Sequence, residues 1–254
     1  MTPRDKRLHE QLREDFAALR LTYFLEHYAE TLDEAARNNT SMLEVLSLLV
    51  GGEATTRAEK AMQRRIAQAR LPKRKTLEEY NFDFPRKIPK EKVLRLFDCE
   101  FVETHGCAVF VGGTGTGKSH LLAALGYVAC EKGIKVRFTR VIDMINVLTT
   151  AQLNGTLEKK LREYIRPELL LLDELGYLPI DKRGADLMFQ VVAARYEAGS
   201  IVVTTNRKFR EWGKIFDVDN TLATAMIDRL MHHGEAIVIE GRSFRTNDDN
   251  DSES

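Results

Sequence analysis

The stretch that decides the fold reads Gly112-Gly113-Thr114-Gly115-Thr116-Gly117-Lys118-Ser119. It matches the phosphate-binding loop pattern G-x-x-x-x-G-K-[ST], and it lies between an apolar run of strand length and a helix-compatible segment, as that pattern requires. The glycines let backbone N–H groups turn toward phosphate oxygens, and the start of the helix adds partial positive charge. We expect Lys118 to reach the β- and γ-phosphates of ATP and Ser119 to ligate Mg²⁺.

Around this loop, short apolar or β-branched runs alternate with longer helical segments. Strands alternating with helices predict an α/β fold, with a parallel five-stranded sheet covered by helices on both faces. The expected strands are 107–111, 136–139, 169–172, 200–204 and 236–239.

A second motif follows the strand at 169–172, where Asp173 and Glu174 come directly after four leucines. That strand delivers Asp173 to the carboxyl edge of the sheet, where open α/β sheets hold their ligands, and we expect it to hold the Mg²⁺ hydration shell. Glu174 is placed to orient and deprotonate an attacking water, which favours hydrolysis over phosphotransfer. Asn206 follows the strand at 200–204 and is a candidate to bond that water or the γ-phosphate, although an Asn after a strand is usually a turn residue.

The N-terminal part of the chain is predicted to be a small helical domain. Apolar residues recur at helical spacing over 8–23, a second helical pattern covers 24–36, and Ser41 with Glu44 forms a capping box before a helix that we expect to end at the Gly51-Gly52 pair. The segment 57–75 carries eight basic residues and one acid and is predicted to contain a basic helix that Pro72 ends. We expect domains at 1–74 and 75–246, joined by an irregular linker at 76–89, and a disordered acidic tail at 247–254.

Composition excludes several classes of protein. The chain has 254 residues and a net charge of zero, and its longest apolar runs fall short of the roughly 18 residues that a membrane span needs. The first ten residues are charged and lack the apolar core of a secretory signal. We therefore expect a cytoplasmic location. Three cysteines without C-x-x-C spacing argue against a disulfide framework or a zinc site, so we expect buried thiols in a reducing compartment. We also expect no metal at His232 and His233, because adjacent histidines on a helix point in different directions, nor at His120, which follows the loop alone.

Taken together, these motifs resemble the AAA+ ATPases, and the ends of the chain look like the IstB-like helper ATPases of bacterial insertion sequences, which are relatives of the DnaC helicase loaders. In AAA+ terms, 112–119 is Walker A, 169–174 is Walker B and Asn206 is the sensor-1 residue. The further resemblance rests on three stretches: 221–230 with His232-His233-Gly234-Glu235, Gly241-Arg242-Ser243-Phe244-Arg245, and Leu71-Pro72 with 75–82.

The resemblance implies features that the residues alone do not. Arg229 would be an arginine finger inserted into the ATP site of a neighbouring subunit, which implies a homo-oligomer with ATP at subunit junctions. Only 14 residues follow Glu240, too few for a C-terminal helical lid, and Arg245 is a candidate substitute for a lid-borne sensor.

The predicted function is an ATP-dependent, DNA-binding ATPase that helps a transposase to select target DNA, with the transposition role resting on family resemblance alone. A replicative helicase loader is the alternative, and a P-loop kinase for a small metabolite is a third. Glu174, Arg229 and the basic helix count against the kinase. Two basic surfaces are candidates for contacting duplex DNA: Arg57, Lys60, Arg64 and Arg65, and Lys159, Lys160 and Arg162.

Overall fold

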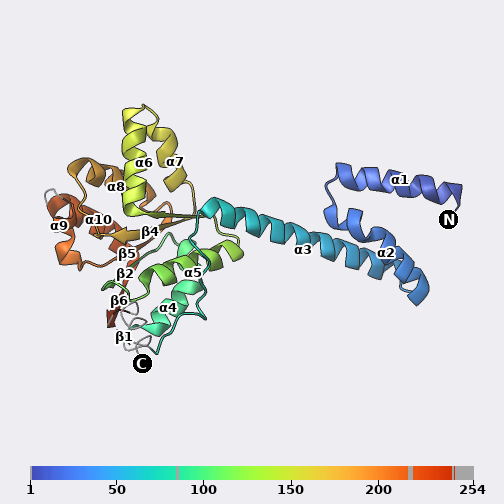
Figure 1. The fold of residues 1–254 in the computed structure, drawn as a ribbon, viewed down its shortest axis with the longest axis horizontal. Coiled ribbons are helices and arrows are strands. Elements are labelled where there is room, and N and C mark those ends of the chain that lie inside the picture. The colour runs from blue at the N-terminus through green and yellow to red at the C-terminus, as the bar shows by residue number, and fades with distance from the viewer. Residues whose placement is uncertain (1, 84–85, 217–219, 242, 244–254) are drawn as a thin grey trace, which may run out of the picture. The chain divides into compact units, whose positions relative to one another are not determined.

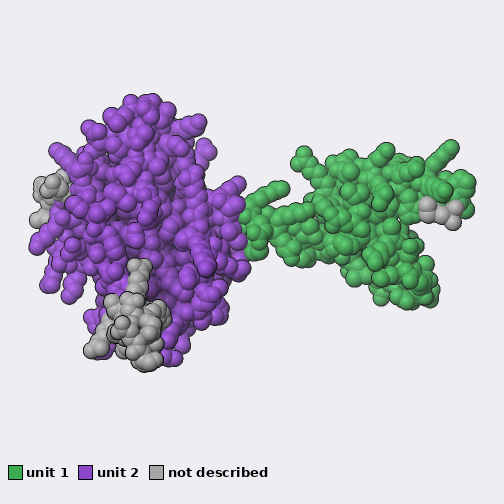
Figure 2. Space-filling model, in the orientation of Figure 1, with its two compact units in different colours: residues 1–64 green, residues 65–254 purple. Residues whose placement is uncertain are grey.

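A computed structural model describes residues 2–83, 86–216, 220–241 and 243 of the chain. The chain separates into two compact units, residues 1–64 and 65–254 (Figure 2). The second unit therefore begins upstream of Arg74, where the sequence placed the domain boundary, because Ala69 is buried in the core of the second unit. None of the described helices is long and apolar enough to span a membrane.

The first unit is helical, as predicted, with different boundaries. Instead of one helix over 8–23, the chain turns at residues 19–21, where Arg20 has a left-handed φ of 56°, so that Tyr23 belongs to the second helix. A small core forms around Tyr28, Val45 and Leu49. The helices that supply it are α1 (Pro3–Ala18), α2 (Thr22–Asn38) and the first part of α3 (Met42–Ala69).

Helix α3 begins with the predicted capping box but does not end where the sequence predicted. The capping box is present, because Ser41 N donates to Glu44 Oε2 at 2.8 Å and Glu44 N donates to Ser41 Oγ at 3.3 Å. The helix nevertheless runs through Gly51 and Gly52 into the basic segment, so the expectation that it ends there is wrong. A Cβ on Gly52 would lie 2.1 Å from Cε1 of Tyr23. This glycine therefore serves close packing within a helix rather than its termination.

The second unit contains the predicted parallel sheet (Figure 1). Five strands are parallel in the order β6-β2-β5-β4-β3, and a short strand that the sequence did not reveal, β1 (Arg86–Lys87), pairs antiparallel with β6 at one edge. The linker expected over 76–89 is irregular over 76–83 and then forms β1. The five parallel strands are β2 (Cys107–Gly112), β3 (Val136–Arg140), β4 (Leu169–Leu175), β5 (Ser200–Thr205) and β6 (Gly234–Gly241).

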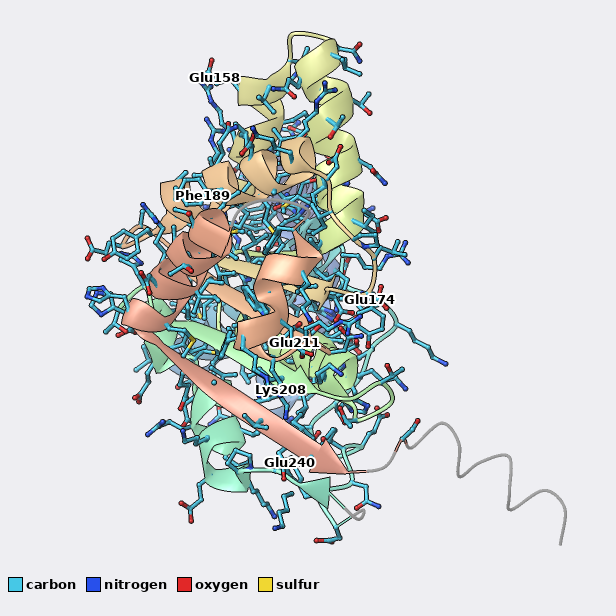
Figure 3. All side chains as sticks on the ribbon, turned by 90° about the vertical axis from the view of Figure 1, so that its left-hand side faces the viewer. Glu158, Glu174, Phe189, Lys208, Glu211 and Glu240 are labelled. Carbon is cyan, nitrogen blue, oxygen red and sulfur yellow. The ribbon has the colours of Figure 1, made fainter. Side chains whose placement is uncertain are left out.

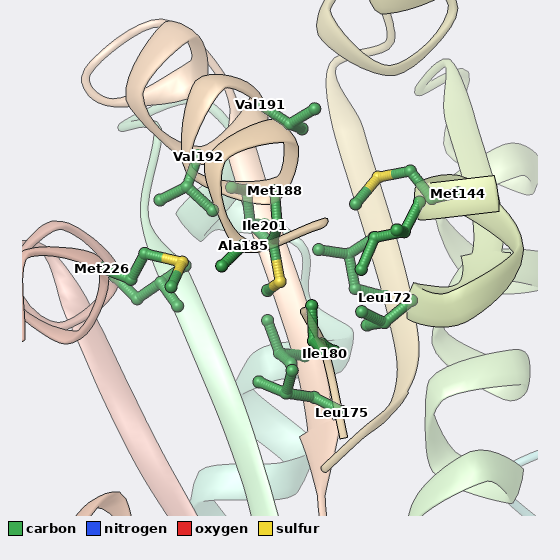
Figure 4. Close-up of a cluster of buried hydrophobic side chains, with 14 of the residues drawn as sticks. Met144, Leu172, Leu175, Ile180, Ala185, Met188, Val191, Val192, Ile201 and Met226 are labelled. Carbon is green, nitrogen blue, oxygen red and sulfur yellow. The ribbon is translucent and has the colours of Figure 1, made fainter. Parts of the chain in front are cut away.

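Helices cover both faces because alternate residues of each strand point to opposite sides. Leu169 and Leu171 of β4 pack under α4 (Lys90–Phe97), α5 (Lys118–Glu131) and the end of α3, whereas Leu170 and Leu172 pack on the other face. Figure 4 shows that second cluster, whose members include Leu172, Ile201 and Met144. Its helices are α6 (Val141–Leu153), α7 (Leu157–Ile165), α8 (Lys182–Arg195), α9 (Trp212–Ile215) and α10 (Asn220–His232), and short 3-10 turns lie at Glu100–Val102 and Phe209–Glu211.

Candidate functional site

The loop at 112–119 lies where the sequence predicted it, between the end of β2 and the start of α5. Gly115 and Gly117 have φ values of +76° and +85°, a region that residues with a Cβ rarely adopt. Gly112 is required for a different reason, since a Cβ there would lie 2.5 Å from the carbonyl oxygen of Ile239 on β6. The glycines thus allow the loop to close tightly over the sheet edge.

Lys118 is the first residue of α5, and its side chain turns back over the loop. Nζ donates to the Gly113 carbonyl oxygen at 2.7 Å and contacts Thr116 Oγ1 at 3.5 Å, and the residue is only 3% exposed. The ammonium is therefore held inside the curve of the loop, where phosphate oxygens are expected.

Ser119 and Asp173 are brought together although 54 residues separate them. Ser119 Oγ donates to Asp173 Oδ1 at 2.9 Å, and Asp173 is 5% exposed at the carboxyl edge of β4. Both groups offer oxygen ligands, the type that Mg²⁺ prefers. The two predicted metal ligands therefore form one oxygen pair beside the loop.

Thr204 on β5 is a site residue that the sequence analysis missed. Its hydroxyl donates to the same Asp173 Oδ1 and accepts from the Glu174 backbone N–H at 2.9 Å. It thereby fixes both acidic residues of the motif at once. The available signal was its position next to the last residue of an apolar strand, two residues before Asn206.

Glu174 adopts an unusual backbone conformation, with φ at +64°, where β4 departs from regular pairing between Leu172 and Leu175. Left-handed backbone at a residue with a side chain costs of order 1 kcal/mol and is enriched at functional sites, although turns such as that at Arg20 adopt it too. The irregular pairing and the Thr204 bond hold Glu174 at the wall of the cavity described below, and Figure 3 shows it at the edge of the sheet.

A cavity of about 480 Å³ opens in front of the loop. Gly115, Gly117, Lys118, Ser119 and Glu174 line it on one side, and the segment 72–81 lines it on the other. This volume falls within the roughly 300–1,000 Å³ of small-molecule pockets.

The segment 72–81 crosses the start of α5 as an irregular strap, held by hydrogen bonds to the loop and to the helix. Tyr80 Oη donates to the Thr116 carbonyl at 3.2 Å, and Tyr127 Oη donates to the Pro72 carbonyl at 2.8 Å. His120 Nε2 lies 2.7 Å from the Thr76 carbonyl oxygen, so this histidine helps to hold the strap against α5. The sequence predicted only a linker here.

Asn206 follows β5 directly at the same edge of the sheet. It is half-buried, and its Oδ1 is buried with no hydrogen-bond partner in the described part of the chain. A buried acceptor without a partner costs about 1–3 kcal/mol, so it marks a place where a donor is missing. Together with the curled loop and the oxygen pair, this orphaned atom fits a site that binds a nucleotide with Mg²⁺.

Arg229 lies elsewhere on the same unit. Its Nη1 donates to the Ala225 carbonyl at 3.0 Å, and Cζ lies 4.8 Å from the centre of the Phe189 ring. Figure 3 shows Phe189 well apart from Glu174, and Arg229 does not line the cavity of its own chain.

His232 and His233 do not point apart as expected. Their ring centroids are 4.1 Å apart, and possible ligand atoms of both histidines and of Glu197 lie within 4.8 Å of one another. The prediction of divergent rings is wrong because His233 has left the helix, which ends at His232. Both histidines are exposed, and His232 Nδ1 lies 2.9 Å from Tyr196 Oη.

The candidate DNA residues on α3 fall into two groups. Lys60 and Arg64 are exposed, and exposed Arg57 pairs with Glu53 at 2.8 Å. Arg65 instead donates from Nε to the Cys130 carbonyl at 2.9 Å, which ties α3 to the end of α5. The Nε of Arg65 is therefore not available to DNA, contrary to the prediction.

On α7, two of the three candidates already have acidic neighbours. Lys160 pairs with Glu163 at 2.6 Å and Arg162 pairs with Glu158, whereas Lys159 is exposed without an ion pair among the described residues. Three further predictions concern residues outside the described part of the chain, which excludes 242 and 244–254. They are the sensor role of Arg245, the absence of a C-terminal lid and the disordered acidic tail.

Comparison with known proteins identifies relatives over almost the whole chain. Residues 14–252 match the family model described as IstB-like ATP binding protein. An ATP-binding protein of insertion sequence IS21 from Pseudomonas aeruginosa is 37% identical over 227 residues, 89% of this chain and 85% of that protein. One of insertion sequence IS5376 from Geobacillus stearothermophilus is 35% identical over 238 residues, 94% of each chain.

Solved structures share the fold of the second unit. The crystal structure of the DnaC helicase loader matches with a TM-score of 0.53 and 22% identity, over 65% of this chain and 96% of that one. DnaI matches with a TM-score of 0.55 and 21% identity, over 67% and 90%. These likenesses establish an AAA+-like fold, and the family match extends through the helical N-terminal part: the chain belongs to the IstB-like ATP binding protein family.

Proposed function

We propose that this chain is an oligomeric ATPase that binds duplex DNA and assists a transposase in selecting its target. The observation that carries the ATPase is the hydrogen-bonded chain from Ser119 through Asp173 and Thr204 to the backbone of Glu174. It joins a phosphate-binding loop to an acidic residue held beside the same cavity. A site that only binds phosphate would not need an acidic residue such as Glu174 beside it.

In this proposal the loop residues 112–118 bind the phosphates of ATP through backbone N–H groups and Lys118. Ser119 and Asp173 hold Mg²⁺, which supplies neutralisation of charge on the phosphate oxygens. Lys118 exchanges its contact with the Gly113 carbonyl for contacts with phosphate oxygens, a small movement because Nζ already lies within the loop.

Glu174 is the proposed general base, which accepts a proton from a water aligned with the γ-phosphate. Asn206 orients the same water or the phosphate. A water in that place would donate to the Oδ1 that now lacks a partner, whereas a phosphate oxygen would instead accept from Nδ2. Thr204 is a positioning residue, since it acts through Asp173 and Glu174.

Arg229 is proposed to act in the ATP site of a neighbouring subunit. Its guanidinium stacks on Phe189 and lies far from Glu174 of its own chain, so a contribution in cis would need a large rearrangement. A finger supplied in trans places ATP at subunit junctions and makes hydrolysis depend on assembly.

The first unit, residues 1–64, with the basic segment that follows it is the proposed DNA-binding and oligomerisation part, and the second unit, which begins at residue 65, carries the ATPase. The relatives are ATP-binding proteins of insertion sequences, which supports assistance to a transposase. A cytoplasmic location is part of the same proposal. Burial raises the pKa of Cys99 and of Cys130 to about 11, so both free thiols stay protonated and poorly reactive near neutral pH.

ATPase assays with and without duplex DNA test the proposal. Pull-down experiments with a transposase and with a hexameric helicase follow. Stimulation of ATP hydrolysis by DNA without a small-molecule acceptor is expected, together with retention of the chain by a transposase of an insertion sequence of this kind. Retention by a hexameric helicase instead would favour the helicase loader, and transfer of phosphate to a metabolite would favour the kinase.

A further inference from the structure

A second cavity, of about 440 Å³, lies beside Ser119 and Asp173 on the side away from the loop glycines. It opens at the carboxyl end of β3, between the start of α6 and the segment that follows α3. Three arginines line it, Arg70 from that segment and Arg137 and Arg140 from β3. We call it the arginine cavity.

Arg137 is the deepest of the three, with a side chain only 9% exposed. Its guanidinium lies over the Tyr164 ring at 5.5 Å, and its nearest carboxylate, Glu163, is 3.8 Å away. Glu163 has a closer partner in Lys160, at 2.6 Å. The Nε of Arg137 is buried and has no hydrogen-bond partner among the described residues, so a buried cation here is incompletely compensated.

Arg70 and Arg140 provide the rim of the cavity. Arg70 is exposed, and its side chain makes no hydrogen bond or ion pair within the described residues. Arg140 pairs with Asp143 at 2.8 Å and precedes α6, whose first turn receives no side-chain cap. Uncapped N–H groups at a helix start add to the attraction for an anion.

The geometry points to the arginine cavity as a binding site for a backbone phosphate of DNA, an inference that rests on the proposed DNA-binding function. A phosphate offers several acceptor oxygens to the guanidinium groups that line the cavity from β3 and from the segment after α3. It would give Arg70 a partner and bring an acceptor to the wall that Arg137 forms.

The position of the cavity has a consequence for ATP hydrolysis. Ser119 and Asp173 line it, and Arg140 is the register partner of Asp173 across the β3–β4 pair. A DNA phosphate held here would therefore lie on the other side of the oxygen pair from ATP. A phosphate beside Arg140 would offset part of the positive charge that this guanidinium exerts on Asp173, its register partner.

Fluorescence anisotropy with a labelled DNA duplex tests the site, using the full chain with Mg²⁺ and a non-hydrolysable ATP analogue. Arg70→Gln and Arg140→Gln should each weaken binding about tenfold, as expected for loss of a charge-assisted hydrogen bond. Each should also reduce the slope of log affinity against log salt by about 0.9 per bound subunit. Arg166→Gln is the matched control, since Arg166 is an exposed arginine that precedes β4 at the opposite edge of the sheet.

The outcomes separate this site from the function on which it rests. If the unsubstituted chain binds DNA and all three variants bind with its affinity and salt slope, the cavity is overturned while the DNA-binding function stands. If the unsubstituted chain binds no DNA, both fall. If Arg70→Gln reduces thermal stability, Arg70→Lys replaces it as the test, because lysine keeps the charge without the guanidinium fork. An affinity for DNA between those of the unsubstituted chain and Arg70→Gln then supports the site, and an unchanged affinity overturns it.

Discussion

The hydroxyl of Ser119 donates to Oδ1 of Asp173 at 2.9 Å, across 54 residues of sequence. That bond connects the start of α5 with the end of β4 and brings the two motifs of the sequence to one point on the sheet edge. It also pre-forms the oxygen pair proposed to hold Mg²⁺, so binding of the metal need not assemble its ligands.

The first prediction contrasts two variants of the proposed site. Lys118→Ala should abolish nucleotide binding because it removes the cation held within the loop. Glu174→Gln should bind ATP normally and accumulate an ATP-bound assembly, with turnover reduced by about 10²- to 10⁴-fold, since a positioned base contributes that much. Nucleotide binding by calorimetry and phosphate release measure the two effects, and near-normal turnover in Glu174→Gln would remove Glu174 from its proposed role.

A second prediction tests whether Arg229 acts in trans. Arg229→Ala subunits keep an intact loop, whereas Lys118→Ala subunits keep the finger. Mixing the two inactive variants should restore part of the ATPase activity, because some junctions then combine both intact halves. Mixtures that never exceed the sum of the separate variants would contradict the trans assignment.

Thr204 should matter although it touches no phosphate in the proposed site. Thr204→Val removes the donor to Asp173 and the acceptor for the Glu174 N–H while keeping the shape of the side chain. Loss of these bonds should reduce kcat more than ATP affinity and lower the free energy of unfolding by about 1–3 kcal/mol. Thr204→Ser keeps the hydroxyl and should restore turnover, and failure of that rescue would mean that packing alone explains the loss.

The basic helix should contribute phosphate contacts without sequence preference. Lys60→Gln with Arg64→Gln should weaken duplex binding and flatten the slope of log affinity against log salt by about two per engaged subunit, because each phosphate contact contributes about 0.9. Preference among DNA sequences should not change. Arg65→Gln tests a different role, since its Nε bonds the Cys130 carbonyl, and it should affect thermal stability more than the slope.

Arg195 should be essential for stability. This guanidinium is 1% exposed and donates to five carbonyl oxygens, those of Tyr164, Ile165, Pro167, Glu168 and Ser200. Arg195→Lys cannot reach all five and should lower the free energy of unfolding by about 3 kcal/mol, since each unsatisfied buried acceptor costs about 1–3 kcal/mol. Denaturant unfolding measures this, with exposed Arg183→Lys as the control; equal stability of the two variants would show that the carbonyls find other partners.

Several features follow from the sequence by itself because they depend on neighbouring residues. The loop at 112–119 is contiguous, so its glycines, Lys118 and Ser119 define a phosphate site before any folding is considered. The alternation of apolar runs with helical segments likewise determines five parallel strands, since each strand must be buried on both faces. Asp173 could be placed at the same edge because the carboxyl ends of parallel strands meet there.

Only the tertiary structure decided the rest, because it depends on which distant segments come into contact. Thr204 resembles any strand threonine until β5 lies beside β4, and Arg70 joins Arg137 and Arg140 only when the end of α3 lies near β3. Gly52 reads as a helix stop, yet the ring of Tyr23 packed against it makes the glycine necessary within a helix. Local sequence specifies backbone preference, whereas these partners are set by packing between segments far apart in the chain.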